Sequence, residues 1–215
     1  MFIKCLTVGP IGTNCYIACD RTTDRAVVID PGSEAARVTA ALAETGCKAD
    51  YVVLTHGHAD HMGAAHEVLA ATGAKLALLA DELPLLNGPQ NLWGDIYGGA
   101  EFTSLSPDIL LHDGDTVALG ALQLKAMHTP GHTAGSCCLL APDALFSGDT
   151  LFSGGAGRTD LPTGSSSDLL RSLRRLFALE GDLQVFPGHG AFTTLARERA
   201  ENPYAGALSG GEDYQ

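Results

Sequence analysis

The feature of this sequence that most restricts its fold is a cluster of titratable side chains directly after an apolar run. Residues 51–54, YVVL, have the composition of a short buried strand, and the segment that follows contains His56, His58, Asp60 and His61. Unpaired polar groups in a protein interior are costly, so a cluster of them at the end of a buried strand needs partners. A metal ion can satisfy several at once, which predicts a metal site completed by ligands from elsewhere in the chain.

Strands and helices alternate along the rest of the chain. Apolar runs bounded by Gly, Pro and Asn predict strands at residues 2–8, 14–19, 26–30, 51–54 and 75–80, and later at 114–120, 122–128, 136–141, 144–148 and 183–188. Helical spacing of apolar residues predicts helices at 33–46, capped by Ser33, at 62–73, at 166–179 and at 193–202. Residues 81–107 are irregular, with one short helix near 81–86, and are expected to form a long functional loop, with a packed insertion as the alternative.

These elements fall into two similar halves, each with strands followed by helices. The fold class is therefore α/β, and a sandwich of two sheets with helices on the outside would bury the apolar strands. The 215 residues suffice for one domain with a substantial core. We assign residues 1–205 to this domain and expect the polar tail, residues 206–215, to be disordered.

Composition disfavours several classes of function. The net charge of −12 argues against nucleic-acid binding, which needs a basic surface. No apolar run approaches the roughly 20 residues that span a bilayer, and the N-terminus lacks the pattern of a secretory signal. We therefore expect a cytoplasmic protein without membrane contacts. The six cysteines include no C-x-x-C pair, and we expect them to be small apolar residues of the interior. The sequence does not indicate an oligomeric state.

Three further candidate ligands follow apolar strands in glycine-rich turns: His132 in TPGHT, Asp149 in SGD and His189 in PGHG. Glycines let the backbone bend tightly beside a crowded centre, and strand ends are common places for functional side chains. The other histidines have simpler explanations. We expect His66 on an exposed helix face, His112 in a polar turn, and His128 either beside His132 or in a strand-end hydrogen bond.

Together, the motifs T-H-x-H-x-D-H at residues 55–61, TPGHT, SGD and PGHG resemble the motif set of the metallo-β-lactamase superfamily. They occur in the order typical of that superfamily and extend over nearly the whole chain. The resemblance implies an αβ/βα sandwich of the metallo-β-lactamase type, in agreement with the two-sheet arrangement above. It also implies a set of seven metal ligands: His56, His58, Asp60, His61, His132, Asp149 and His189.

The resemblance and the ligand types suggest how two divalent ions would be held. We expect His56, His58 and His132 around one ion. We expect Asp60, His61 and His189 around the other, with Asp149 bridging both. Imidazole and carboxylate ligands suit zinc, iron or manganese, and we expect zinc. Two ions held in this way lie about 3.5–4 Å apart with a shared hydroxide between them.

Within the superfamily the chain is similar to short glyoxalase II-like thioester hydrolases. Lactam-hydrolysing members generally lack the bridging Asp, this chain lacks the RNA-binding arm of the nuclease branch, and the flavodiiron branch has Glu in place of His58. The resemblance thus implies a hydroxyacylglutathione hydrolase-like enzyme acting on a small-molecule thioester. A metal-bound hydroxide would attack the thioester carbonyl, and Asp60 would orient this nucleophile as the catalytic residue.

Arg158, in the segment GRTD, is the candidate substrate-binding residue. A guanidinium can hold a carboxylate of the thiol carrier through two parallel hydrogen bonds. A structural pair between Arg158 and Asp160 is the alternative. Typical glyoxalase II enzymes carry a further C-terminal helical domain that contacts glutathione, for which this sequence shows no counterpart, so the thiol carrier stays open.

Two other functions remain as alternatives. GRTD also occurs in persulfide dioxygenases, and a mononuclear iron enzyme of that kind would use His56, His132 and Asp149 as a two-His, one-carboxylate triad. A non-enzymatic metal-binding protein is the second alternative. The complete ligand set argues against it, because degenerate copies usually lose ligands.

Overall fold

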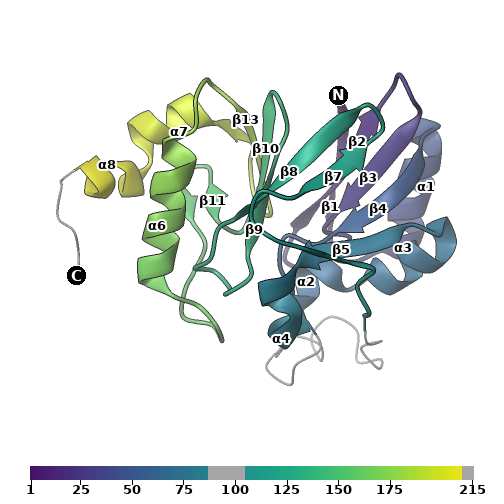
Figure 1. Ribbon diagram of the computed structural model, residues 1–215, viewed down its shortest axis with the longest axis horizontal. Coiled ribbons are helices and arrows are strands. Elements are labelled where there is room, and N and C mark those ends of the chain that lie inside the picture. The colour runs from purple at the N-terminus through teal and green to yellow at the C-terminus, as the bar shows by residue number, and fades with distance from the viewer. Residues whose placement is uncertain (87–104, 210–215) are drawn as a thin grey trace.

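A computed structural model describes residues 1–86 and 105–209 of the chain. Two six-stranded sheets pack against each other, and helices cover the outer face of each sheet (Figure 1). Helices α1 and α3 lie on the side of the N-terminal sheet, and α6, α7 and α8 lie on the side of the other. This is the αβ/βα sandwich expected from the alternation of apolar strands and helices.

The first sheet has the strand order β1-β2-β3-β4-β5-β6. β1, β2 and β3 are antiparallel neighbours, whereas β3 to β6 run parallel. Parallel neighbours need crossover connections, which contain α1 and α3 here. The strands are β1 Phe2–Val8, β2 Thr13–Asp20, β3 Arg25–Ile29, β4 Lys48–Val53, β5 Lys75–Leu79 and β6 Ile109–Leu111. The helices are α1 Ala35–Thr45, α2 Ala59–Met62, α3 Ala65–Thr72, the 3-10 helix η1 Ala80–Glu82 and α4 Leu83–Leu86.

The second sheet has the order β14-β13-β10-β9-β8-β7. β10 and β13 are parallel, and the amphipathic helix α6 lies in the connection between them. A small hairpin of β11 and β12 also lies in this connection. The strands are β7 Thr116–Leu119, β8 Leu122–His128, β9 Cys137–Leu140, β10 Ala144–Gly148, β11 Leu151–Phe152, β12 Gly155–Ala156, β13 Gln184–Pro187 and β14 Thr193–Thr194. The helices are α6 Ser166–Phe177, α7 Leu195–Glu201 and α8 Pro203–Ser209.

The apolar core consists of three clusters, one between each pair of adjacent layers. Tyr16 and Phe146 meet edge to face in the cluster between the sheets, with ring centroids 5.4 Å apart. Cys137 belongs to that cluster and Cys138 to the one beneath α6, which confirms that the two side chains of this strand point to opposite faces. All six cysteines have free thiols. The sequence prediction of buried, unpaired cysteines is confirmed for five of them; Cys5 is half-buried.

Three predicted element boundaries are wrong. Ser33 does not cap α1: Glu34 is the N-cap, in a left-handed conformation with φ of 58°. The helix predicted at 62–73 is α3, which begins only at Ala65, and a separate short helix, α2, ends at Met62. Residues 206–209, assigned to a disordered tail, belong to α8, and residues 210–215 lie outside the described residues. Most of the predicted loop at 81–107 lies outside them too. Among the described helices, none has the length and apolar character to cross a membrane.

Candidate metal centre

The structure brings all seven predicted ligands together at one end of the two sheets. Each follows a strand of the sandwich, so rigid elements fix where its backbone lies. His56 and His58 lie on the loop after β4, Asp60 and His61 on α2, His132 on the loop from β8 to β9, Asp149 directly after β10, and His189 shortly after β13. The first sheet therefore supplies four ligands and the second sheet supplies three.

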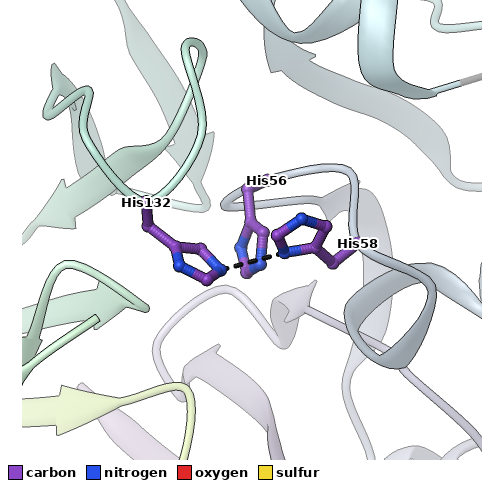
Figure 2. A group of neighbouring side chains, drawn as sticks. All are labelled: His56, His58 and His132. Carbon is purple, nitrogen blue, oxygen red and sulfur yellow. Dashed lines mark hydrogen bonds between the residues drawn. The ribbon is translucent and has the colours of Figure 1, made fainter. Parts of the chain in front are cut away.

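His56, His58 and His132 form the first ligand group (Figure 2). Their imidazole rings converge from two loops, and the ring centroids lie 4.7–4.8 Å apart. Nδ1 of His58 lies 2.9 Å from Nε2 of His132. The three nitrogens can therefore face a common point, as predicted for one ion.

Asp60, His61 and His189 form the second ligand group. Oδ2 of Asp60 lies 3.2 Å from Nε2 of His61 and 3.1 Å from Nε2 of His189. The two imidazole nitrogens are 3.3 Å apart. This is the grouping that the sequence analysis assigned to the second ion.

The carboxylate of Asp149 lies between the two groups. Its Oδ2 is 3.5 Å from Nε2 of His132 and 3.6 Å from Nε2 of His189, and its Oδ1 is 3.4 Å from Nε2 of His61. Asp149 therefore reaches ligands of both groups, as the predicted bridging role requires.

Two buried polar atoms support metal binding directly. Among the described residues, Nε2 of His56 and Oδ1 of Asp149 are the buried side-chain nitrogen and oxygen atoms that have no hydrogen-bond partner. A buried polar group without a partner is unfavourable, and a cation would satisfy both atoms. The nitrogen and oxygen donors of the seven ligands suit a divalent ion such as zinc, iron or manganese.

The electrostatic surroundings favour the metal-binding forms of His56, His58 and Asp60. Burial and the neighbouring histidines lower the pKa of His56, and burial with His132 and His61 lowers that of His58 to about 4. Both imidazoles are therefore neutral at neutral pH, which is the form that binds metals. Although burial opposes it, His61 and the hydrogen bond from His189 hold the pKa of Asp60 below its usual value, so that its carboxylate is charged.

Groups outside the ligand set fix the orientation of the ligands. Asp30, the residue after β3, lies 2.9 Å from Nδ1 of His61 and accepts hydrogen bonds of 2.7 Å from the Thr55 N–H and hydroxyl. The Thr13 hydroxyl donates to Oδ2 of Asp60 at 3.0 Å. Such contacts determine which imidazole nitrogen is free to bind an ion.

Asp30 was not singled out in the sequence analysis. Its position was the available signal, because β3 neighbours β4 in parallel and their carboxyl ends meet at the same edge of the sheet.

Glycine is required where the backbone passes closest to the ligands. A Cβ at Gly188 would lie 2.2 Å from Oδ1 of Asp149 and 2.7 Å from Cε1 of His61. At Gly32 a Cβ would lie 1.5 Å from the carbonyl oxygen of Asp60. The PGHG motif thus contains glycine because the strand end packs directly against two ligands.

A cavity of about 480 Å³ opens onto the metal centre. Five ligands line it, and apolar side chains with Arg158 form the rest of its wall: His58, Asp60, His132, Asp149 and His189, with Ile11, Phe152, Ala156, Arg158 and Leu161. The guanidinium of Arg158 makes two 2.7 Å hydrogen bonds to Asp160, and both side chains are exposed. The structure therefore contains the Arg158–Asp160 pair, while Arg158 also lines the cavity.

The other three histidines belong to neither ligand group. His66 and His112 are exposed. The Nε2–H of His128 donates to the Ala134 carbonyl at 2.8 Å, which is the strand-end hydrogen bond named as one of its two explanations.

Two sheets flanked by helices, with His and Asp ligands gathered at the ends of their strands, define a metal-binding α/β sandwich protein. The chain belongs to the metallo-beta-lactamase superfamily, whose sequence model matches residues 8–189. It is 37% identical over 216 residues to an uncharacterized protein of Aquifex aeolicus, covering 98% of this chain and all of that protein. It is 31% identical over 213 residues to the hydroxyacylglutathione hydrolase GloC of Haemophilus influenzae, covering 97% of this chain and all of GloC. The likeness to GloC agrees with the glyoxalase II-like motifs.

Solved structures of the superfamily superpose closely on this chain. BLEG-1 B3 metallo-beta-lactamase is 32% identical with a TM-score of 0.87, covering 95% of this chain and 99% of that one. TTHA1623, in a di-iron-bound form, is 33% identical with a TM-score of 0.81, covering 94% of this chain and 99% of that one. ETHE1 from Myxococcus xanthus is 32% identical with a TM-score of 0.80, covering 96% of this chain and 85% of that one. The predicted fold is thus confirmed.

Proposed function

We propose that this protein is a metal-dependent thioester hydrolase of the hydroxyacylglutathione hydrolase type. The observation that carries the proposal is the cavity whose wall contains ligands of both groups, so that a substrate in it would touch the metal centre. The likeness to GloC over the whole length of both chains supports the thioester as substrate. The apolar side chains of the cavity suit an acyl group or the stem of a thiol carrier.

The ligand groups would each hold one divalent ion, and we propose zinc. His56, His58 and His132 would hold the first and Asp60, His61 and His189 the second, with Asp149 contacting both. When bound, such ions make water a nucleophile at neutral pH and polarise a carbonyl oxygen.

The protein's own groups would position the reactants. The charged carboxylate of Asp60 lines the cavity and is fixed by the Thr13 hydroxyl, so it can orient a water molecule toward the substrate carbonyl. A thiolate is a good leaving group, and the reaction therefore needs no strong general acid.

Hydrolysis of defined thioesters by the zinc-loaded protein tests the proposal. We expect cleavage of S-D-lactoylglutathione or of an acyl-CoA, with loss of activity in Asp60→Asn. A β-lactam is included in the panel because of the likeness to a metallo-beta-lactamase. Absence of turnover with every thioester, or turnover of the β-lactam alone, would contradict a thioester hydrolase.

A mononuclear iron persulfide dioxygenase is the second candidate. Nε2 of His132 and Oδ2 of Asp149 lie 3.5 Å apart, which suits two members of the predicted triad with His56, and the likeness to ETHE1 is compatible with it. Metal content and oxygen consumption separate the candidates. One iron per chain with oxygen uptake on glutathione persulfide favours the dioxygenase, and two ions per chain without uptake favours the hydrolase.

A further inference from the structure

Glu82 is a buried carboxylate that belongs to neither ligand group. It lies on η1 directly after β5, and only 1% of its surface is exposed. Both of its oxygens accept hydrogen bonds: Oε1 from the Gly57 N–H at 2.7 Å, and Oε2 from the Thr133 hydroxyl at 2.9 Å and the Gly135 N–H at 2.8 Å. Burial raises the pKa of the Glu82 carboxyl to about 7, and these three hydrogen bonds act in the opposite direction by favouring its charged form.

The donors to Glu82 lie on the two loops that carry the first ligand group. Gly57 stands between His56 and His58 on the loop after β4, and Thr133 directly follows His132 on the loop from β8 to β9. One loop comes from the first sheet and the other from the second. Glu82 therefore connects the histidine pair of one half of the molecule to the third histidine in the other half.

Close packing around Glu82 restricts how far the two loops can move relative to its carboxylate. A Cβ at Gly135 would lie 2.3 Å from the Glu82 backbone nitrogen, and a Cβ at Gly57 would lie 3.2 Å from Oε1. The Ser136 hydroxyl lies 2.7 Å from the Thr133 hydroxyl, which extends the network along the His132 loop. Small residues on both loops thus allow their backbone N–H groups to approach one carboxylate closely.

The second ligand group depends on other contacts. Asp30 makes a hydrogen bond to Nδ1 of His61, and the Thr13 hydroxyl donates a hydrogen bond to Asp60. Neither residue is a donor to Glu82, so a change at Glu82 acts on the first group selectively.

We propose that Glu82 is a positioning residue that sets the separation between His132 and the pair His56 and His58, and thereby the affinity of this group for a divalent ion. The inference rests on the proposed metal dependence, but it concerns binding rather than turnover. Removing a group that orients metal ligands typically costs about 10–100-fold in metal affinity. Because the donors to Glu82 flank His56, His58 and His132 rather than the ligands of the second group, we expect the second group to bind its ion with nearly unchanged affinity.

Glu82→Gln tests the proposal, since it keeps the side-chain volume but replaces one acceptor oxygen by an amide NH2 that faces a donor. Metal-free protein is titrated with Zn²⁺ in competition with a chromophoric chelator, and the dissociation constants of both steps are measured. His58→Ala and His189→Ala show which step belongs to which ligand group. We expect the step lost in His58→Ala to weaken about 10–100-fold in Glu82→Gln, and the other step to change less than about threefold.

Glu198 provides a matched control. It is also 1% exposed and accepts three hydrogen bonds, from the Gly154 N–H at 2.9 Å, the Thr193 hydroxyl at 2.6 Å and the Asn202 amide at 2.7 Å. Glu198→Gln should lower the melting temperature as Glu82→Gln does, yet leave the affinity of the first ligand group unchanged.

Four results would overturn or redirect the proposal. Wild-type affinity at both steps in Glu82→Gln, or equal weakening in Glu198→Gln, would show that Glu82 only stabilises the fold. If Glu82→Gln does not fold, Glu82→Asp, which retains the charge and is shorter by one methylene, is measured instead with the same expectation. Wild-type protein that takes up no Zn²⁺ would contradict the proposed metal dependence, a different outcome from equal affinities in wild type and variant.

Discussion

His58 and His61 are three residues apart, yet their surroundings shift their pKa values in opposite directions. Burial and two neighbouring histidines lower the pKa of His58 to about 4. Burial also acts to lower the pKa of His61, but the carboxylates of Asp60, Asp149 and Asp30 outweigh it and raise the value well above the usual one. Residue type alone therefore does not determine how a histidine behaves in this centre, because the number of carboxylates beside it decides.

Asp149→Ala is expected to lower both metal content and catalytic rate. The Asp149 carboxylate lies within 3.6 Å of ligands in both groups, so its removal takes one oxygen donor from each side of the centre. We expect loss of at least one ion and a fall of more than about 100-fold in kcat/KM, since removing groups that only orient ligands already costs 10–100-fold. Elemental analysis and thioester kinetics measure the two effects. Exposed His112, changed to Ala, is the control, and full metal content with normal activity in Asp149→Ala would exclude it as a ligand.

Arg158→Ala is expected to impair substrates with a carboxylate-bearing thiol carrier more than small neutral thioesters. Arg158 lines the cavity, but Asp160 already occupies its guanidinium through two hydrogen bonds. A hydrogen bond to a charged group contributes about 1.5–3 kcal/mol, so a loss of about 10–150-fold in kcat/KM is expected for charged carriers. Asp160→Ala removes the partner of the Arg158 guanidinium and should therefore raise kcat/KM for substrates with a carboxylate-bearing carrier. Equal losses on both substrate classes, with a lowered melting temperature, would mean that the pair with Asp160 is only structural.

At the scale of elements, local patterns located most strands and helices but not every boundary. Helix α1 begins at Ala35, and its N-cap is Glu34 rather than Ser33. The Glu34 carboxylate accepts a hydrogen bond from the Gly9 N–H and pairs with Arg37, so a contact from the loop after β1 fixes this end of the helix. The roles of Asp30 and Glu82 depend likewise on residues distant in sequence. The seven candidate ligands could be selected from the sequence because their motifs are local, whereas the residues that orient them act through tertiary contacts.

Asp20→Asn is expected to lower the free energy of unfolding by an amount that depends on pH. The Asp20 carboxylate connects the turn after β2 to the turn between β7 and β8. The Thr22 hydroxyl and the N–H groups of Ala121 and Thr22 lower the pKa of Asp20 below its usual 3.8. A lowered pKa means that the charged form stabilises the fold above about pH 4, and that this contribution is lost as the pH falls toward the lower folded value. The difference between wild type and variant should therefore be largest at neutral pH and shrink in acid.

Urea denaturation of the metal-free proteins at about pH 7 and about pH 3.5 measures this difference. Asp24→Asn, in the same turn, is the control because Asp24 is exposed and Asn tolerates its positive φ of 53°. A gap between wild type and Asp20→Asn that widens in acid would contradict the sign of the shift.

The stability of the fold is expected to depend on the side chains that α6 buries and not on those that it exposes. Leu173 has no exposed surface and packs in the cluster beneath α6, whereas the adjacent Arg174 is exposed. Leu173→Ala should lower the free energy of unfolding by about 2–5 kcal/mol. Arg174→Ala should change it by less than about 0.5 kcal/mol. Chemical denaturation measures both, and similar values for the two variants would mean that α6 is not packed as described.

At the scale of the whole molecule, the metal centre joins the two sheets. Four ligands come from the first half of the chain and three from the second, and Asn14 and Tyr16 of β2 also donate hydrogen bonds to the Pro187 carbonyl at the end of β13. The fold class was predictable because alternating apolar strands and helices have few ways to be buried. The substrate was not, because a cavity wall assembled from separate loops leaves no local signature.

Removal of metal is therefore expected to destabilise the entire sandwich. An ion that binds only the folded protein stabilises it by about 2.7 kcal/mol at a free concentration of 100 times Kd. For a chain of this size, each kcal/mol corresponds to about 2–4 °C, so a chelator should lower the melting temperature by about 5–11 °C. Adding Zn²⁺ back should restore it, and Asp149→Ala should respond less to both treatments because it lacks a ligand shared by the two groups. Calorimetry of the wild type and of Asp149→Ala, each with and without chelator, measures these differences. Equal melting temperatures of the metal-free and Zn²⁺-loaded wild type would show that the seven ligands do not link the halves of the molecule through an ion.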